Sequence, residues 1–288
     1  MRSLLLSLLL ILLARPDVAH ALVFDNGAVN DYFGQSLIGN NFVRDDLLGN
    51  PTTLNMRAGS ELGASTTIEG SSALGVFPAS TLFRVEAEGT STVEVLGGSI
   101  TAGLDLRNTT VGTVSSGDVS NTSGPALRLF DGAQATVSGG TFSASTVIVA
   151  LAGGQSTLRV EGATFGGGQL RAEGDATVDI AGGSAFAQIV CIDQAVVTLY
   201  GEDFEASEGG GTVLAGYGEI VDAFNGTLTG TLADGSPLTI DAQNGIAGSR
   251  IVLAPSPAVV PALGPIPLVV LLPGLLAGVG WLAIEHRT

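Results

Sequence analysis

The sequence predicts an all-β protein whose architecture is a right-handed parallel β-helix, and three observations support that prediction. Similar segments recur at intervals near 21 residues, short stretches alternate apolar and polar residues, and glycine contributes 42 of the 288 residues while aromatic residues make up only 5%. Recurrence, period-two alternation and glycine-rich turns together are typical of a solenoid of short strands.

The repeat is clearest between residues 126 and 197. Residues 126–137 align without a gap with residues 147–158, at an offset of 21, and the theme returns in residues 169–178 and 188–197. An apolar residue closes each unit, in the series Ile100, Val119, Phe142, Phe165, Phe186 and Phe204. We expect this series to form an internal stack, with glycine at corners that need positive φ or close backbone approach.

Each unit also contains short stretches with the alternation of a half-buried strand. Val93 and Val95 fall on one face of such a strand and Glu94 on the other, and Leu158 and Val160 do the same. A unit of this length is shorter than the 30 or more residues of a βαβ crossover but suits one coil of a β-helix. Right-handed winding follows from the crossover rule.

These patterns divide the chain between its two ends. Residues 51–253 would supply roughly nine or ten coils, and residues 22–50 an N-terminal cap or entry segment. Residues 226–240 fit either final coils or a β cap. A two-sheet antiparallel sandwich is the alternative, since it also consists of short strands and glycine-rich turns. The self-similarity near 21 residues favours the coil.

Residues 1–21 have the features of a secretory signal peptide. Arg2 precedes a leucine-rich segment over residues 4–13, and Ala19 and Ala21 form an Ala-x-Ala cleavage site. That segment is shorter than the roughly 20 residues of a membrane-spanning helix. We therefore expect an N-terminal signal helix, export, and cleavage by signal peptidase after Ala21.

The opposite end has the features of a membrane segment. After a proline-rich linker, residues 254–265, the stretch over residues 266–284 carries no charge. As a helix it would be about 28 Å long, close to the hydrocarbon thickness of a bilayer. We expect a C-terminal transmembrane helix, then a short cytoplasmic end at residues 285–288, an orientation that Arg287 supports.

This tail resembles the PEP-CTERM class of bacterial sorting tails, on the strength of Pro255, Pro257, Val260, Pro261 and Gly264 before the apolar segment. In that class an exosortase-type enzyme of the inner membrane recognises and cleaves the tail and passes the protein towards the cell surface or the extracellular matrix. The resemblance covers only residues 255–288. Ser256 stands where the family's triplet has glutamate, and Arg287 alone replaces its basic cluster, so permanent anchoring is the alternative to cleavage.

Charge and cysteine content limit the partners. The net charge is −16, and removing residues 1–21 takes away Arg2, Arg15 and Asp17 and changes it to −17. Such a surface repels nucleic acid, so we expect no nucleic-acid partner. Cys191 is the single cysteine, which excludes an internal disulfide, and its apolar neighbours indicate a small buried side chain.

The sequence holds no recognisable catalytic set. The only histidines, His20 and His286, lie in the signal peptide and the tail, so the folded region has none for a triad, a general base or a zinc site. We therefore expect no enzyme, no catalytic residues and no cofactor. A calcium ion is the one alternative to this expectation, because acidic residues at turns offer oxygen ligands. The candidate ligands are Asp175, Asp193, Glu202 and Asp203.

The expected function is an exported structural or adhesive protein of the cell envelope, sorted or anchored through its tail and in contact with exopolysaccharide of a biofilm or matrix. The alternative is a carbohydrate-active β-helix enzyme, a polysaccharide lyase or glycosidase, that uses the acidic turns. In that reading Asp131, Asp175 and Asp193 occupy comparable turns. Arg128, Arg159 and Arg171 would neutralise charge, although their alternation with apolar residues is that of a solvated face.

Overall fold

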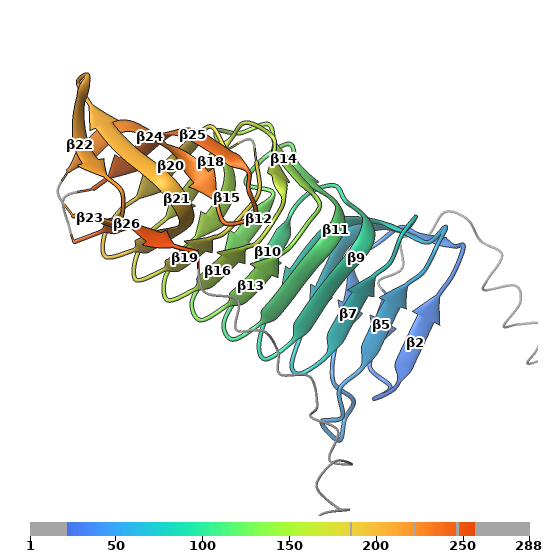
Figure 1. Ribbon diagram of the computed structural model, residues 1–288. Helices are drawn as coiled ribbons and strands as arrows, with labels where there is room; N and C mark the ends of the chain where they lie inside the picture. The colour runs from blue at the N-terminus through green and yellow to red at the C-terminus, as the bar shows by residue number, and fades with distance from the viewer. Residues whose placement is uncertain (1–21, 185, 222, 246–247, 257–288) are drawn as a thin grey trace, which may run out of the picture. The chain divides into compact units, whose positions relative to one another are not determined.

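The computed structural model describes residues 22–184, 186–221, 223–245 and 248–256, and all regular elements within them are strands. The strands stack into a parallel β-solenoid of about nine turns, which confirms the all-β, parallel β-helix prediction (Figure 1). None of the elements in these ranges is a helix that could cross a membrane. The predicted signal peptide, with Ala19 and Ala21, and the predicted helix over residues 266–284 lie outside the described residues.

Each coil contributes strands to three columns, called A, B and C here in the order in which the chain visits them. Column A contains β1 (Leu22–Phe24), β4 (Asn41–Val43), the second half of β6 (Glu61–Ile68), the second half of β8 (Thr81–Ala87), β10 (Leu104–Leu106), β12 (Leu127–Leu129), β15 (Ile148–Ala152), β18 (Gln169–Ala172), β20 (Gln188–Cys191) and β25 (Pro237–Asn244).

Columns B and C complete the coil. Column B contains β2 (Val29–Tyr32), β5 (Thr53–Met56), β7 (Ala73–Val76), the first part of β9 (Thr92–Ile100), the first part of β11 (Val111–Asn121), β13 (Gln134–Val137), β16 (Thr157–Val160), β19 (Thr177–Ile180), β21 (Val196–Glu208) and β26 (Arg250–Pro255). Column C contains β3 (Ser36–Leu37), the first halves of β6 and β8, the ends of β9 and β11, β14 (Thr141–Ala144) and β17 (Thr164–Phe165).

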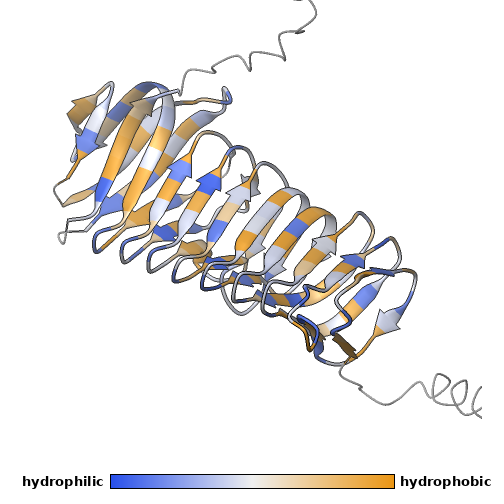
Figure 2. Ribbon diagram, turned by 90° about the horizontal axis from the view of Figure 1, so that it is seen from below, coloured by the Kyte–Doolittle hydropathy of each residue, from blue (hydrophilic) through white to orange (hydrophobic). Residues whose placement is uncertain are grey.

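The alternation in sequence decides which side chains fill the interior. Val93, Val95, Leu158 and Val160 are all buried, as predicted, whereas Glu94 between the two valines is exposed. Figure 2 shows the same alternation of apolar and polar residues along the strands. Because every coil buries its apolar face only against its neighbours, the core runs the length of the solenoid.

The predicted internal stack is present through its first five members. Ile100, Val119, Phe142 and Phe165 are successive register partners in column C. The rings of Phe142 and Phe165 stack with centroids 5.1 Å apart, and those of Phe165 and Phe186 with centroids 4.5 Å apart. Phe204 is buried but meets Tyr217 edge-on at 6.4 Å, because β21 there pairs with antiparallel strands.

The gap-free alignment at an offset of 21 is wrong by two residues. It would set Val137 beside Leu158, whereas the structure pairs Val137 with Val160 and Ala135 with Leu158, an offset of 23. In the next coil Thr157 pairs with Thr177, an offset of 20. The strands keep their register while the corners between them change length, and an alignment without gaps averages over those changes.

The turn between columns A and B repeats one left-handed backbone position in successive coils. Positive φ values between 59° and 79° occur at Gly70, Gly89, Asn108, Asp131, Gly154, Gly174 and Asp193. Glycine, asparagine and aspartate are the residues that adopt this conformation at least cost. The prediction of glycine corners with positive φ is therefore confirmed for this turn, with aspartate or asparagine in three of the coils.

The two ends of the solenoid differ. Residues 22–50, predicted as a cap or entry segment, contain β1, β2 and β3, which form a first coil, and β4, which begins the second. The first coil pairs in parallel with β4, β5 and β6 of the second. At the other end β22 (Gly211–Ala215), β23 (Gly218–Ile220) and β24 (Phe224–Leu232) run antiparallel to their partners β21, β26 and β25. The stretch over residues 226–240 thus contributes to a β cap, and among the described strands antiparallel pairing is confined to β21 to β26.

Candidate functional site

The corner between columns C and A changes length over three successive coils. Leu82, Ile100 and Val119 are register partners at the end of column C, and Val85, Leu104 and Leu127 are register partners at the start of column A. The corner between these positions contains residues 83–84 in the first coil, residues 101–103 in the second and residues 120–126 in the third. A pocket of about 300 Å³ lies at this step, lined by Phe83, Arg84, Ala102, Asn121, Ser123, Gly124 and Arg128. The lengthening of one corner is therefore what hollows the surface here.

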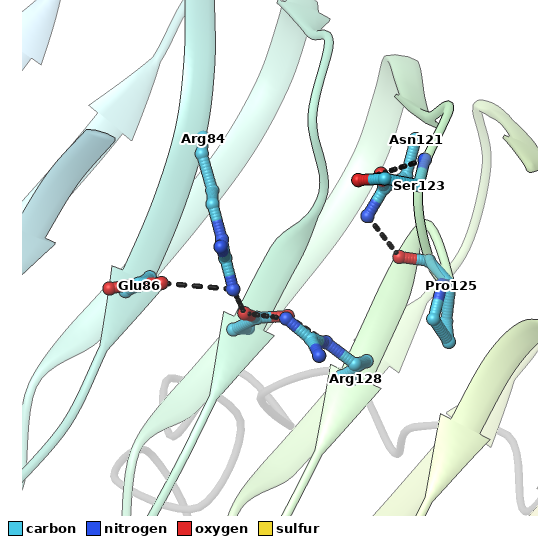
Figure 3. Close-up of polar contacts among 7 residues, drawn as sticks. Arg84, Glu86, Asn121, Ser123, Pro125 and Arg128 are labelled. Carbon is cyan, nitrogen blue, oxygen red and sulfur yellow. Dashed lines mark hydrogen bonds and ion pairs between the residues drawn. The ribbon is translucent and has the colours of Figure 1, made fainter. Parts of the chain in front are cut away.

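Beside the pocket, Asp105 holds two arginines. Its neighbours Leu104 and Leu106 are core residues, so Asp105 lies on the outer face of column A, yet its side chain is only 1% exposed. Nη2 of Arg84 and both Nε and Nη2 of Arg128 donate to its carboxylate. Arg84 also forms an ion pair with Glu86 at 2.9 Å (Figure 3). One buried carboxylate thus fixes two guanidinium groups from the coils on either side of it.

The electrostatics of this group are balanced. Two arginines face two carboxylates, so the local formal charge is zero. A carboxylate so little exposed requires such partners, because an unpaired buried charge is strongly destabilising. The hydrogen bond to Asp105 raises the pKa of the Arg84 guanidinium above its ordinary value, so Arg84 stays charged. The carboxylate is occupied by guanidinium donors, and the arrangement is a positioning device for the two arginines.

The long corner on the other side of the pocket is also fixed by its own hydrogen bonds. Nδ2 of Asn121 donates to the carbonyl oxygen of Pro125 at 2.8 Å, and Oδ1 accepts from the backbone N–H of Ser123 at 2.9 Å (Figure 3). Asn121 itself is only 5% exposed. The wall formed by Ser123 and Gly124 is therefore preorganised.

Some donors at the pocket remain available. Within the described part of the chain, the hydrogen bonds and ion pairs of Arg84 use Nη2, and those of Arg128 use Nε and Nη2. Nη1 of each arginine takes no part in these contacts, whereas Nε of Arg84 is buried and has no partner among the described residues. The exposed ring of Phe83, at 46%, adds an apolar surface to the pocket. The site thus combines fixed N–H donors, a hydroxyl and an aromatic face.

The acidic candidates do not gather around one point. Asp175 and Asp193 lie in the same turn of consecutive coils, as expected, but one residue out of register, because Asp193 lies beside Gly174 and Asp175 beside Gln194. Oδ2 of Asp193 accepts from the backbone N–H of Gly174 at 3.1 Å. Glu202 pairs with Thr231 in the antiparallel segment, and Asp203 has positive φ at a bulge there. No group of three metal-ligating side chains occurs among the residues with described positions.

The remaining sequence candidates are placed individually. Arg159 forms an exposed ion pair with Glu161 at 2.8 Å, and Arg171 pairs with Glu173 at 3.0 Å, as expected of a solvated face. Pro255 ends β26 opposite Gly201. The other residues of the predicted sorting motif, Pro257, Val260, Pro261 and Gly264, lie outside the described residues.

Cys191 is a buried thiol, as its apolar neighbours indicated. Burial raises its pKa to about 11. Its Sγ lies 3.1 Å from the carbonyl oxygen of Ala195. The thiol is therefore protonated and enclosed at neutral pH, which is the state of a packing residue.

Sequence reasoning missed Asp105 altogether. Leu104-Asp105-Leu106 has the alternation of any half-exposed strand, and Arg128 was interpreted as part of a solvated face. The site becomes visible only when Glu86, Asp105 and Arg128 are known to be register partners, at offsets of 19 and 23. The available signal was an acidic residue between two leucines, in a repeat whose next unit carries Arg128 between two leucines.

No protein-family model, curated protein or solved structure matches this sequence. The fold and the site define the class: a parallel β-solenoid repeat protein with an antiparallel C-terminal cap and a polar pocket at one corner. The chain's function is therefore argued from its own residues.

Proposed function

We propose that this chain is an exported structural or adhesive protein of the cell envelope or extracellular matrix, sorted or anchored through its C-terminal tail and in contact with exopolysaccharide. The observation that carries the proposal is the combination of a signal-peptide pattern and a sorting-type tail with a solenoid between them. Signal peptidase and an exosortase-type enzyme would process the two ends, and the solenoid, with right-handed winding, would be the part displayed.

The proposed mechanism is architectural. Residues at equivalent outward positions of column B form a row of register partners: Glu94, Thr113, Thr136, Arg159, Asp179 and Thr198. Neighbouring members lie about 4.8 Å apart, the spacing of paired strands. Such a surface presents polar groups at a fixed spacing without any moving part, as a scaffold or adhesive surface requires.

The carbohydrate-active enzyme gains no support from the described residues. Asp175 and Asp193 are not register partners, and the buried Asp105 is occupied by arginine donors. The double variant Asp175→Asn with Asp193→Asn should leave any turnover of acidic polysaccharides unchanged. Loss of turnover with the fold intact, measured by circular dichroism, would restore the enzyme hypothesis.

The intact mass of the protein recovered from whole cells and from the medium tests the proposal. Export predicts a chain that begins at Leu22. Sorting predicts an end near residues 255–265, and permanent anchoring predicts a membrane-bound chain that ends at Thr288. A chain that keeps Met1 and stays in the cytoplasm would refute both. A bulky residue in Ala21→Leu should block processing at the front end, whereas Ala28→Leu, beyond the predicted site, should not.

A further inference from the structure

The pocket at the corner of columns C and A has the composition of a ligand site. Its volume of about 300 Å³ is at the lower end of the roughly 300–1,000 Å³ usual for small-molecule sites. It combines an exposed aromatic ring, a serine and two arginines, from coils that register sets side by side. A site of this size suits a single sugar unit of a longer chain.

The polar groups that line it are held before any ligand arrives. Asp105 fixes both guanidinium groups, and Asn121 fixes the backbone at Ser123. Preorganised donors lose little conformational entropy on binding, so less of the interaction energy is offset by ordering the site. Elsewhere in the described coils each ion-paired arginine has a single carboxylate partner. Arg159 and Arg171 pair with a glutamate on their own strand or turn, and Arg44 and Arg57 pair with an aspartate of the preceding coil.

Charge decides which class of ligand fits. The four charged groups at the site sum to zero, and the chain without residues 1–21 carries −17. A polyanion would meet long-range repulsion with no local positive charge to offset it. A neutral ligand rich in hydroxyl groups can accept from Nη1 of the two arginines and lay its C–H face on the ring of Phe83. It can also donate to the hydroxyl oxygen of Ser123, whose own proton goes to Oδ1 of Asn121.

We propose that this pocket binds an uncharged hexose unit of a neutral polysaccharide. The inference deepens the proposed function, because it names the class of exopolysaccharide that the displayed solenoid would contact. It does not depend on how the ends of the chain are processed. A chain that binds sugar but is not exported would refute only the proposed function, and an exported chain without this site would refute only the pocket.

The test is saturation-transfer NMR and titration calorimetry of the purified full-length chain in detergent, with dextran, galactomannan and their oligosaccharides as neutral probes. Alginate and polygalacturonate are the acidic probes. At least one neutral probe should bind, and Phe83→Ala should weaken that binding at least tenfold. Arg128→Lys should do the same, because lysine keeps the charge but cannot form the paired hydrogen bonds to Asp105 and at the same time present a further N–H to the pocket.

Matched variants separate the site from the fold. Val147→Ala removes another exposed apolar side chain, and Arg159→Lys alters another outward arginine, and neither should change the affinity. Arg128→Lys and Phe83→Ala must retain the circular dichroism spectrum and melting profile of the parent. If either variant fails this control, Ser123→Ala takes its place and should likewise weaken binding. Failure of every neutral probe to bind, preference for an acidic probe, or equal loss in the control variants would overturn the proposal.

Discussion

The regular coils and the C-terminal segment over residues 200–255 pair their strands in different ways. In the coils every strand pairs in parallel with the same column of the next coil, so each added coil leaves a new edge. In the C-terminal segment β24 runs antiparallel to both β21 and β25, and β23 runs antiparallel to β26. The difference teaches that this solenoid is stopped by reversing chain direction.

The first coil, at the N-terminal end of the solenoid, has no antiparallel strands among its described residues. Within the described ranges β1, β2 and β3 each pair on one side only. Large apolar side chains are exposed in the same coil, among them Val29 at 67%, Phe33 at 60% and Ile38 at 68%. The capped and the open end therefore differ both in backbone pairing and in apolar exposure.

The largest expected effect lies in the regular coils. Phe165→Ala removes the middle ring of the stack with Phe142 and Phe186 and should lower the free energy of unfolding by about 3–5 kcal/mol. Phe83→Ala, the same substitution at a half-exposed position, should change it by no more than about 0.5 kcal/mol. Urea unfolding followed by circular dichroism measures both, and equal effects would mean that the stack is not part of the core.

A second test concerns the ion cluster of the coils. Asp105→Ala leaves two guanidinium groups facing each other and should cost about 3 kcal/mol in the same urea experiment. Glu161→Ala breaks only the exposed pair with Arg159 and should cost about 0.5 kcal/mol or less. Replacing the cluster together, as Asp105→Leu with Arg84→Met and Arg128→Met, should recover most of the loss. A triple variant no more stable than Asp105→Ala would contradict this account.

The third prediction separates the cap from the coils. A Cβ at Gly201 would lie 1.9 Å from the carbonyl oxygen of Thr231, so Gly201→Ala must push β24 away from β21. Amide hydrogen exchange in β24 should rise by an amount equivalent to about 2 kcal/mol, while columns A and B of the earlier coils keep their protection. Gly211→Ala, whose nearest contact would be at 3.8 Å, is the control. Uniform loss of protection along the solenoid would show that the cap is not a separate unit.

The smallest effect concerns Cys191, where the last coils meet the cap. Burial raises the pKa of its thiol to about 11, so the folded protein holds this proton more tightly than the unfolded chain. Its contribution to stability is present below about pH 9 and is lost as the pH rises towards 11. Cys191→Ala should flatten this part of the stability–pH curve. Rapid alkylation of the folded protein at pH 8 would contradict the buried position.

Much of the fold was predictable because each local pattern dictates one physical outcome. The alternation at Val93 and Val95 and the spacing of Phe142 and Phe165 specify buried positions, and both are buried. The register was not predictable to the residue. Corner lengths vary from two to seven residues between columns C and A, and nothing in a solvated corner marks how many residues it contains.

The same limit hid the site. Asp105 and Arg128 are 23 residues apart, and only the corner over residues 120–126 brings them side by side. The antiparallel cap was equally difficult to anticipate, because Thr227 to Leu232 alternate like any coil strand. Chain direction depends on the turns around residues 209–210 and 233–236. Gly209-Gly210 and Asp234-Gly235 are dipeptides that favour hairpins, but glycine also occurs at most corners of the parallel coils, so these pairs do not stand out.

Distances between spin labels test the central claim, that the chain forms parallel coils in this register. With Cys191 replaced by alanine, a label at Asn55 would be paired in turn with one at Arg159, Asp179 or Thr198, which lie five, six and seven coils away. The account predicts distances of about 24, 29 and 34 Å, rising by one strand spacing per coil. Distances that fail to increase in this order would contradict the solenoid and the roles argued from it.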